Sequence, residues 1–110
     1  MTMRVRVEIL TAGGDPPPAG SSVLVRVLDT ALQDAPSTVM AETTGSVQQA
    51  AAGAPVAVAE LDVPDQQGAR PTIYVHIDVD GDGKVSAGDF VTMQSYPCRG
   101  GQMQVEVRRV

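Results

Sequence analysis

The chain has 110 residues, of which 43% are hydrophobic and 19% are charged. This length and composition predict one globular domain over residues 1–110 and exclude a wholly disordered chain. No run of about 18 apolar residues occurs, so we expect no membrane span. The formal net charge is −5 at pH 7. Because a basic footprint is absent, we expect no nucleic-acid partner.

Strands are expected wherever apolar and polar residues alternate along the chain. The chain has 17 valines and 3 isoleucines against 5 leucines, and β-branched side chains favour pleated structure. In chain order, the predicted strands cover residues 3–9, 23–28, 38–44, 56–61, 73–79, 90–96 and 103–108.

Glycine- and proline-rich stretches separate these segments, at residues 13–20, 34–36, 64–71 and 100–101. Such residues are typical of turns and do not fit the interior of a strand. Short strands at this spacing predict an all-β fold, an antiparallel two-sheet β-sandwich of about seven strands, with a small barrel as the alternative.

The segment DVDGDGKVSAGD, residues 78–89, matches the twelve-position pattern of a calcium-binding loop. The glycine at position 6 allows the sharp turn that the pattern requires. Position 12 holds an aspartate where strong sites have a glutamate, so we expect weaker binding. The predicted oxygen ligands are Asp78, Asp80, Asp82, the Lys84 carbonyl, Ser86 and Asp89.

Calcium prefers six to eight oxygen ligands, and alternate residues of a tight loop direct their oxygens inward. The flanking residues alternate as strands do, so we expect this loop in a β-hairpin, not between the helices of an EF-hand. A second interpretation stays open, because Asp and Gly also favour plain hairpin turns. In that case the loop is a solvated turn that binds no ion.

The remaining reactive residues indicate no catalytic site, and we expect no enzyme. His76 alternates away from the apolar face of its predicted strand, so it is expected at the surface. Cys98 is the single cysteine, which excludes an internal disulfide. The N-terminal residues do not form a secretory signal. The chain as given is therefore expected in the cytoplasm, or in the periplasm or at the outer membrane if a leader was removed.

The order of turns and strands after residue 16 is similar to that of a known family. Its first parts are a Pro-x-Gly step at Pro18 and Gly20 and a Leu-x-Asp step, to which Leu28 and Asp29 correspond with a shifted spacing. The later parts are an Asp-Ala-Pro turn at residues 34–36, an apolar-Ala-Glu strand at Met40, Ala41 and Glu42, the strand with Tyr74, and Ser95, Tyr96 and Pro97. On these residues, the chain resembles the YbaY/YscW-type family of type III secretion lipoprotein chaperones, or pilotins. The resemblance implies a small β-sandwich at the bacterial outer membrane that in some members assists a secretin.

Two functions follow as expectations. The first is a non-enzymatic accessory or binding domain of the YbaY-like kind, which binds one calcium ion in its hairpin loop. The alternative is a secretion pilotin that captures a peptide of an outer-membrane protein, for example by adding a strand to a sheet edge. The first has a metal ion as its partner, and the second has a protein or peptide.

Overall fold

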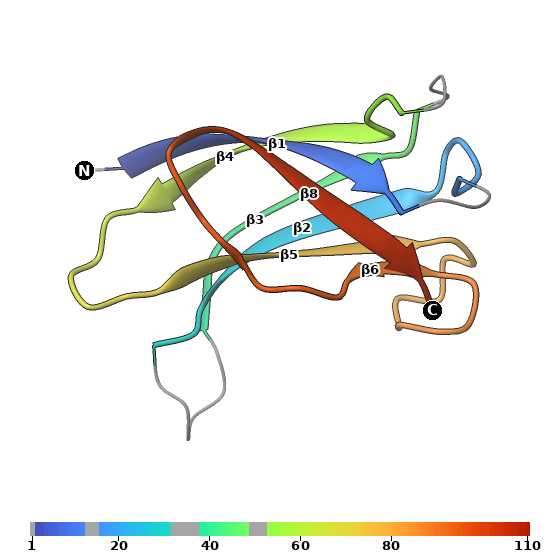
Figure 1. Cartoon of the computed structure of the whole chain (residues 1–110). Helices are drawn as coiled ribbons and strands as arrows, with labels where there is room; N and C mark the ends of the chain where they lie inside the picture. Colours follow the sequence, from blue (N-terminus) through green and yellow to red (C-terminus); the bar gives the residue numbers. More distant parts are fainter. Residues whose placement is uncertain (1, 13–15, 32–37, 49–52) are drawn as a thin grey trace.

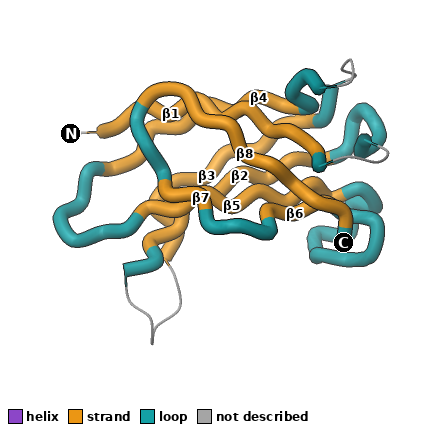
Figure 2. Tube along the Cα trace, viewed as in Figure 1, coloured by secondary structure: helices purple, strands orange, loops and turns teal. Residues whose placement is uncertain are grey.

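The structure is a computed structural model that describes residues 2–12, 16–31, 38–48 and 53–110. Its strands are β1 (Thr2–Thr11), β2 (Ser22–Asp29), β3 (Thr38–Ser46), β4 (Ala57–Pro64), β5 (Pro71–Asp78), β6 (Phe90–Thr92), β7 (Tyr96–Pro97) and β8 (Gly101–Arg109). Figure 2 shows strands and loops only in the described residues. The all-β prediction is therefore confirmed. A helix with the length and apolarity needed for crossing a membrane does not occur in the described part of the chain.

All eight strands belong to one sheet with the order β3-β2-β5-β6-β8-β1-β4, and β7 pairs with β5. The two end strands, β3 and β4, approach within 8 Å of each other. The sheet therefore curls into a nearly closed, barrel-shaped layer, consistent with the predicted sandwich or small barrel (Figure 1).

One pair of strands differs from the predicted antiparallel arrangement. β1 and β8 run parallel, with Val5 opposite Gly101 and Thr11 opposite Val107. These are the first and last strands of the chain, so no hairpin turn sets their relative direction. A hairpin joins neighbouring strands in the antiparallel sense, whereas distant strands are free to pair in either sense.

The interior is filled by the apolar residues of the alternating segments. Every second side chain points to the same face of a strand, and on β1 these inward residues are fully buried. Burying such aliphatic side chains stabilises the fold by about 1.5–3 kcal/mol each. The fully buried side chains are Ile9, Ile73, Ile77, Val5, Val7, Val23, Val25, Val27, Val63, Val75, Val105 and Val107.

The predicted strand over residues 90–96 is wrong as a single strand, because it divides into β6 and β7. The pairing register with β5 shifts between the two short strands. At the break, the backbone N–H of Val75 donates to the Thr92 hydroxyl at 3.3 Å, so a side chain replaces the missing backbone partner. Met93 is then turned outward and is 54% exposed.

Two predicted connections fall partly or wholly on undescribed residues. The turn at residues 34–36 lies outside the described part of the chain, as do residues 13–15 of the predicted 13–20 loop. The described connections lie at the two ends of the barrel-shaped sheet. The acidic segment follows the end of β5, whereas the 65–70 connection leads into its start at the opposite end (Figure 1).

Candidate functional site

The acidic segment joins two neighbouring antiparallel strands. Asp78 is the last residue of β5 and Phe90 is the first residue of β6. His76 pairs with Val91, and Ile77 pairs with Phe90. The predicted strand–loop–strand arrangement is therefore confirmed, and the flanking helices of an EF-hand do not occur here.

Backbone N–H groups of the loop donate to its own carboxylates. Asp78 accepts from the N–H of Gly81 at 3.1 Å and from the N–H of Gly83 at 2.8 Å. The φ angles of these two glycines are 73° and 77°. This left-handed conformation is costly for residues with a Cβ atom. The glycines therefore allow the loop to curl around the Asp78 carboxylate.

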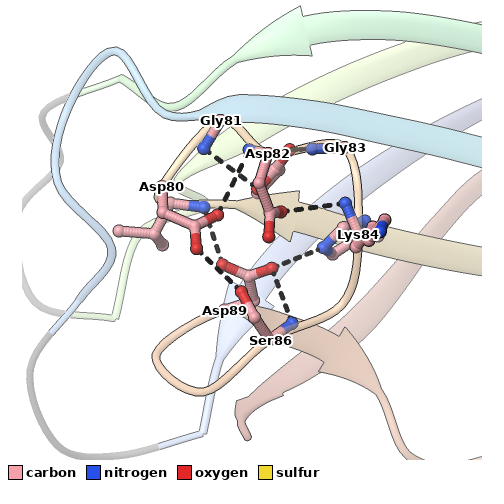
Figure 3. A network of polar contacts seen from close by, with 10 residues as sticks. Asp80, Gly81, Asp82, Gly83, Lys84, Ser86 and Asp89 are labelled. Atoms are coloured by element: carbon pink, nitrogen blue, oxygen red, sulfur yellow. Dashed lines mark hydrogen bonds and ion pairs between the residues drawn. The ribbon is translucent and has the colours of Figure 1, made fainter.

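The middle of the loop repeats this pattern with two further carboxylates. Asp80 accepts from the N–H of Asp82 at 3.3 Å and from the Ser86 hydroxyl at 2.8 Å. Asp82 accepts from the N–H of Lys84 at 2.9 Å. Figure 3 shows the labelled carboxylates of Asp80, Asp82 and Asp89 turned toward the same small space inside the loop.

The exposed carboxylates of the loop differ in acidity. The Ser86 hydroxyl is the main cause that lowers the pKa of Asp80. The Lys84 N–H acts to lower the pKa of Asp82, but partial desolvation and the nearby charges of Asp80 and Asp78 outweigh it, so this pKa is raised. Negative charge within the loop is therefore mutually repulsive.

Asp89 is the buried centre of the site, with 0% of its surface exposed. Its Oδ1 accepts from the N–H of Val79 at 2.9 Å, and its Oδ2 accepts from the N–H of Ser86 at 3.2 Å. Oδ2 also lies 2.9 Å from Nε2 of His76. Burial acts to raise the pKa of Asp89, but the hydrogen bonds from His76, Val79 and Ser86 outweigh it, so the pKa is lowered.

The expectation of a surface position for His76 is wrong, because this residue is only 6% exposed. The alternation of β5 directs His76 away from the barrel interior, as expected. However, the returning end of the loop brings Asp89 against that outer face of β5. The imidazole is therefore enclosed by a segment that follows it in the chain.

The donor set of the loop fits a hard divalent cation. One oxygen from each of Asp78, Asp80, Asp82 and Asp89 lies within 4.8 Å of the others. Two oxygens bound to one calcium ion at about 2.4 Å can be at most about 4.8 Å apart. Asp89 Oδ2 already accepts two hydrogen bonds, so Asp89 can offer one ligand oxygen and not a bidentate pair.

The other two predicted ligands, Ser86 and the Lys84 carbonyl, differ in how they lie relative to the cluster of carboxylates. Ser86 lies beside the cluster through its hydrogen bond to Asp80. Lys84 is exposed, and its N–H is used by Asp82. The sequence reasoning missed His76, which can form a second donor set with Asp78 and Asp89. The spacing of the two residues could have indicated this set, since His76 lies two residues before Asp78 and therefore on the same face of β5.

Two adjoining hollows lie at the end of the sheet opposite to the loop of residues 78–89. One has a volume of about 360 Å³ and the other of about 430 Å³, and both are lined by Ala69, Pro71 and Cys98. Met3 and Met40 line the first hollow. Cys98 is half-buried, and burial raises the pKa of its thiol. A raised pKa disfavours the nucleophilic thiolate. Cys98 therefore contributes an apolar side chain to the lining of both hollows.

Comparison with known proteins gives a match by structure. No family model matches the chain, and no curated protein matches it. A solved structure described as an alternative pilotin from the type II secretion system of Vibrio cholerae aligns with 100% of this chain and 98% of its own. The TM-score is 0.76 and the sequence identity is 19%. The chain has the fold of this pilotin. That likeness supports a pilotin-like fold, whereas the YbaY/YscW assignment stays a prediction.

Proposed function

We propose that this chain is a non-enzymatic secretion pilotin that captures a segment of an outer-membrane protein, at the periplasmic face of that membrane. The observation that carries the proposal is the end-to-end similarity of the fold to the Vibrio pilotin, with neither chain extending much beyond the other. This is the alternative raised by the sequence, and the structural likeness favours it over the accessory calcium domain.

The hollows beside Cys98 support a role in binding a peptide. Their shared wall of Ala69, Pro71 and Cys98 is largely apolar, and the methionines of the first hollow have flexible side chains. Methionine adapts its shape to different apolar groups and is common at binding surfaces. A captured segment would place apolar side chains against this end of the sheet.

The buried acid–base pair supports a structural role more than a catalytic one. The Asp89 carboxylate accepts hydrogen bonds from two backbone N–H groups as well as contacting His76. A general base must reach the proton that it removes. Since this carboxylate is fully enclosed, we assign the pair to holding the loop.

The proposed function is tested with overlapping peptides that cover the outer-membrane secretin encoded in the same genome. Fluorescence anisotropy should detect binding by peptides from one contiguous region of the secretin. Peptides that cover an unrelated outer-membrane protein are the control and should not bind. The absence of binding by every secretin peptide, or equal binding by the control set, would contradict the pilotin role.

A second function, divalent cation binding, is proposed for the loop of residues 78–89. It is supported by the four carboxylates whose oxygens lie within 4.8 Å of one another and by the raised pKa of Asp82. A bound Ca²⁺ would relieve the repulsion among these carboxylates. The Lys84 carbonyl and Ser86 would complete the oxygen ligands.

Calorimetric titration of chelator-treated protein with Ca²⁺ and Mg²⁺ tests this second proposal. A ligand at a hundredfold excess over its Kd stabilises the fold by about 2.7 kcal/mol, so Ca²⁺ should raise the melting temperature. Asp80→Ala should abolish the rise, whereas Asp62→Ala, a control on the outer face of β4, should preserve it. An equal rise in both variants would refute the assignment of the site.

A further inference from the structure

The edges of the sheet do not close completely. β3 and β4 are the two end strands of the sheet, and no ladder hydrogen bond joins them among the described residues. Just beyond the strands, the N–H of Gln48 donates to the carbonyl of Val56 at 2.8 Å and ties them together at one end. The outer edge of β3 therefore has backbone donors and acceptors without a strand partner.

The space between the two edges widens away from this tie. Beside residues 43–46 and 57–60, the hollow has a volume of about 130 Å³. At the other end, Met40 of β3 and Pro64 of β4 line the hollow of about 360 Å³. Figure 1 shows β3 and β4 separating toward that end. Met40 of β3 thus borders an open space.

The first four residues of β3 are less protected than the edge of β4. Natural edge strands are commonly blocked by proline or by charged side chains. β4 ends at Pro64 and carries Glu60 and Asp62, which form ion pairs with Arg4. Residues 38–41 of β3, with the sequence TVMA, contain neither proline nor charge, and Val39 is 51% exposed.

A β-bulge directs a side chain of β3 toward the open space. Ala41 pairs with Val27 and Val39 pairs with Leu28, so Met40 is the extra residue between them. Bulges commonly re-aim side chains at sheet edges. Here, the half-buried Met40 lines the hollow directly beside the unpaired backbone.

The charges near the hollow indicate what kind of segment could bind there. Asp65 lines the same hollow, and no ion pair engages its carboxylate among the described residues. The chain as a whole carries a net charge of −5. A second copy of the chain would therefore add like charge, whereas an extended segment with a basic residue beside an apolar one complements both Asp65 and Met40.

We propose that residues 38–41 of β3 bind an extended segment of the partner protein by strand addition. An apolar side chain of that segment enters the hollow beside Met40, and a basic neighbour pairs with Asp65. The identity of the partner rests on the proposed pilotin function. Main-chain hydrogen bonds provide affinity in this mode, and side-chain pockets provide specificity.

The first test uses the secretin peptide that binds best and two N-methylated versions of it. One version is methylated at the even positions and the other at the odd positions. An added strand uses the N–H of every second residue, so only one version should lose affinity, by about tenfold or more. Equal binding by both versions, or loss in both as expected for a bound helix, would overturn strand addition.

Hydrogen exchange identifies the edge that receives the peptide. Binding should slow amide exchange in residues 38–41 and leave residues 57–64 of β4 unchanged. Val39→Lys should weaken binding by about tenfold, because a lysine on the edge opposes strand pairing and repels a basic segment. Val85→Lys is the matched control, since Val85 is 49% exposed in the acidic loop at the other end of the sheet.

The outcomes separate this inference from the proposed function. Binding of a secretin peptide that is insensitive to Val39→Lys, or protection confined to β4, would overturn the β3 edge and leave the pilotin role intact. Pairing of two copies through β3 in the absence of peptide would also overturn it. The absence of any binding peptide would refute the proposed function itself.

Discussion

His76 and Asp89 lie 2.9 Å apart, between Nε2 and Oδ2, although they come from opposite sides of an acidic loop. Their side chains are 8% and 1% exposed. The contact joins the end of β5 to the start of β6 and encloses a carboxylate that also accepts two backbone hydrogen bonds. It connects the order of the loop to the stability of the hairpin.

Removal of the Asp89 carboxylate should destabilise the fold. Asp89→Ala leaves His76 and the N–H groups of Val79 and Ser86 without their acceptor. Each buried donor left without a partner costs about 1–3 kcal/mol, so the variant should lose several kcal/mol of stability in urea unfolding. Asp62→Ala, at the surface, is the control and should cost about 1 kcal/mol or less. A similar small cost for both variants would contradict the central role of Asp89.

Acid should destabilise the protein through carboxylates whose pKa is lowered on folding. Asp89 is one, and Asp29, which accepts from the N–H groups of Arg70 and Ala31, is another. A lowered folded pKa contributes stability that is present above the ordinary value of 3.8 and is lost as pH falls through the folded value.

Urea unfolding at a series of pH values checks this acid dependence. The free energy of unfolding should decrease as pH falls below about 4. Asp89→Asn cannot bind the extra proton at this position, so its stability should depend less steeply on pH in the same range. An unchanged slope in this variant would show that Asp89 does not contribute.

Gly83 should tolerate substitution poorly although it has space around it. No heavy atom lies within 4 Å of an added Cβ, but φ is +77°. Gly83→Ala should therefore cost about 1–2 kcal/mol, because a left-handed residue with a Cβ is strained. Gly45→Ala is the matched control, since Gly45 also has open space but no positive φ. Thermal unfolding of the two variants compares them, and equal stability would refute the conformational explanation.

Tyr96 should stabilise the region where β6 and β7 are interrupted. Its hydroxyl accepts from the N–H of Glu106 at 3.0 Å and so connects β7 to β8. Tyr96→Phe should cost about 1 kcal/mol in urea unfolding, the net value of one hydrogen bond. Tyr74→Phe is the control and should cost less, because Tyr74 is half-exposed and an exposed hydroxyl can exchange a protein partner for water. A greater loss in the control would contradict the bridging role of Tyr96.

Local patterns predicted much of the molecule correctly. Alternation identified the buried faces of β1, β2, β5 and β8, because a strand sends successive side chains to opposite sides. The spacing of Asp78, Asp80 and Asp82 predicted that their oxygens converge. Both features depend on residues only a few positions apart.

The errors have a common origin in contacts between distant segments. His76 has the alternation of a surface residue, and only the return of Asp89 buries it. The division of residues 90–96 depends on a hydrogen bond from Val75 of another strand to Thr92. Neither contact has a signature in the neighbouring residues.

The sequence by itself determined the strand faces and the composition of the acidic loop, since both arise from short-range backbone geometry. Tertiary structure decided the parallel pairing of β1 with β8, the burial of Asp89 and the unpaired edge of β3. These features depend on which segments meet when the sheet curls, and many pairings of similar strands satisfy the same alternation.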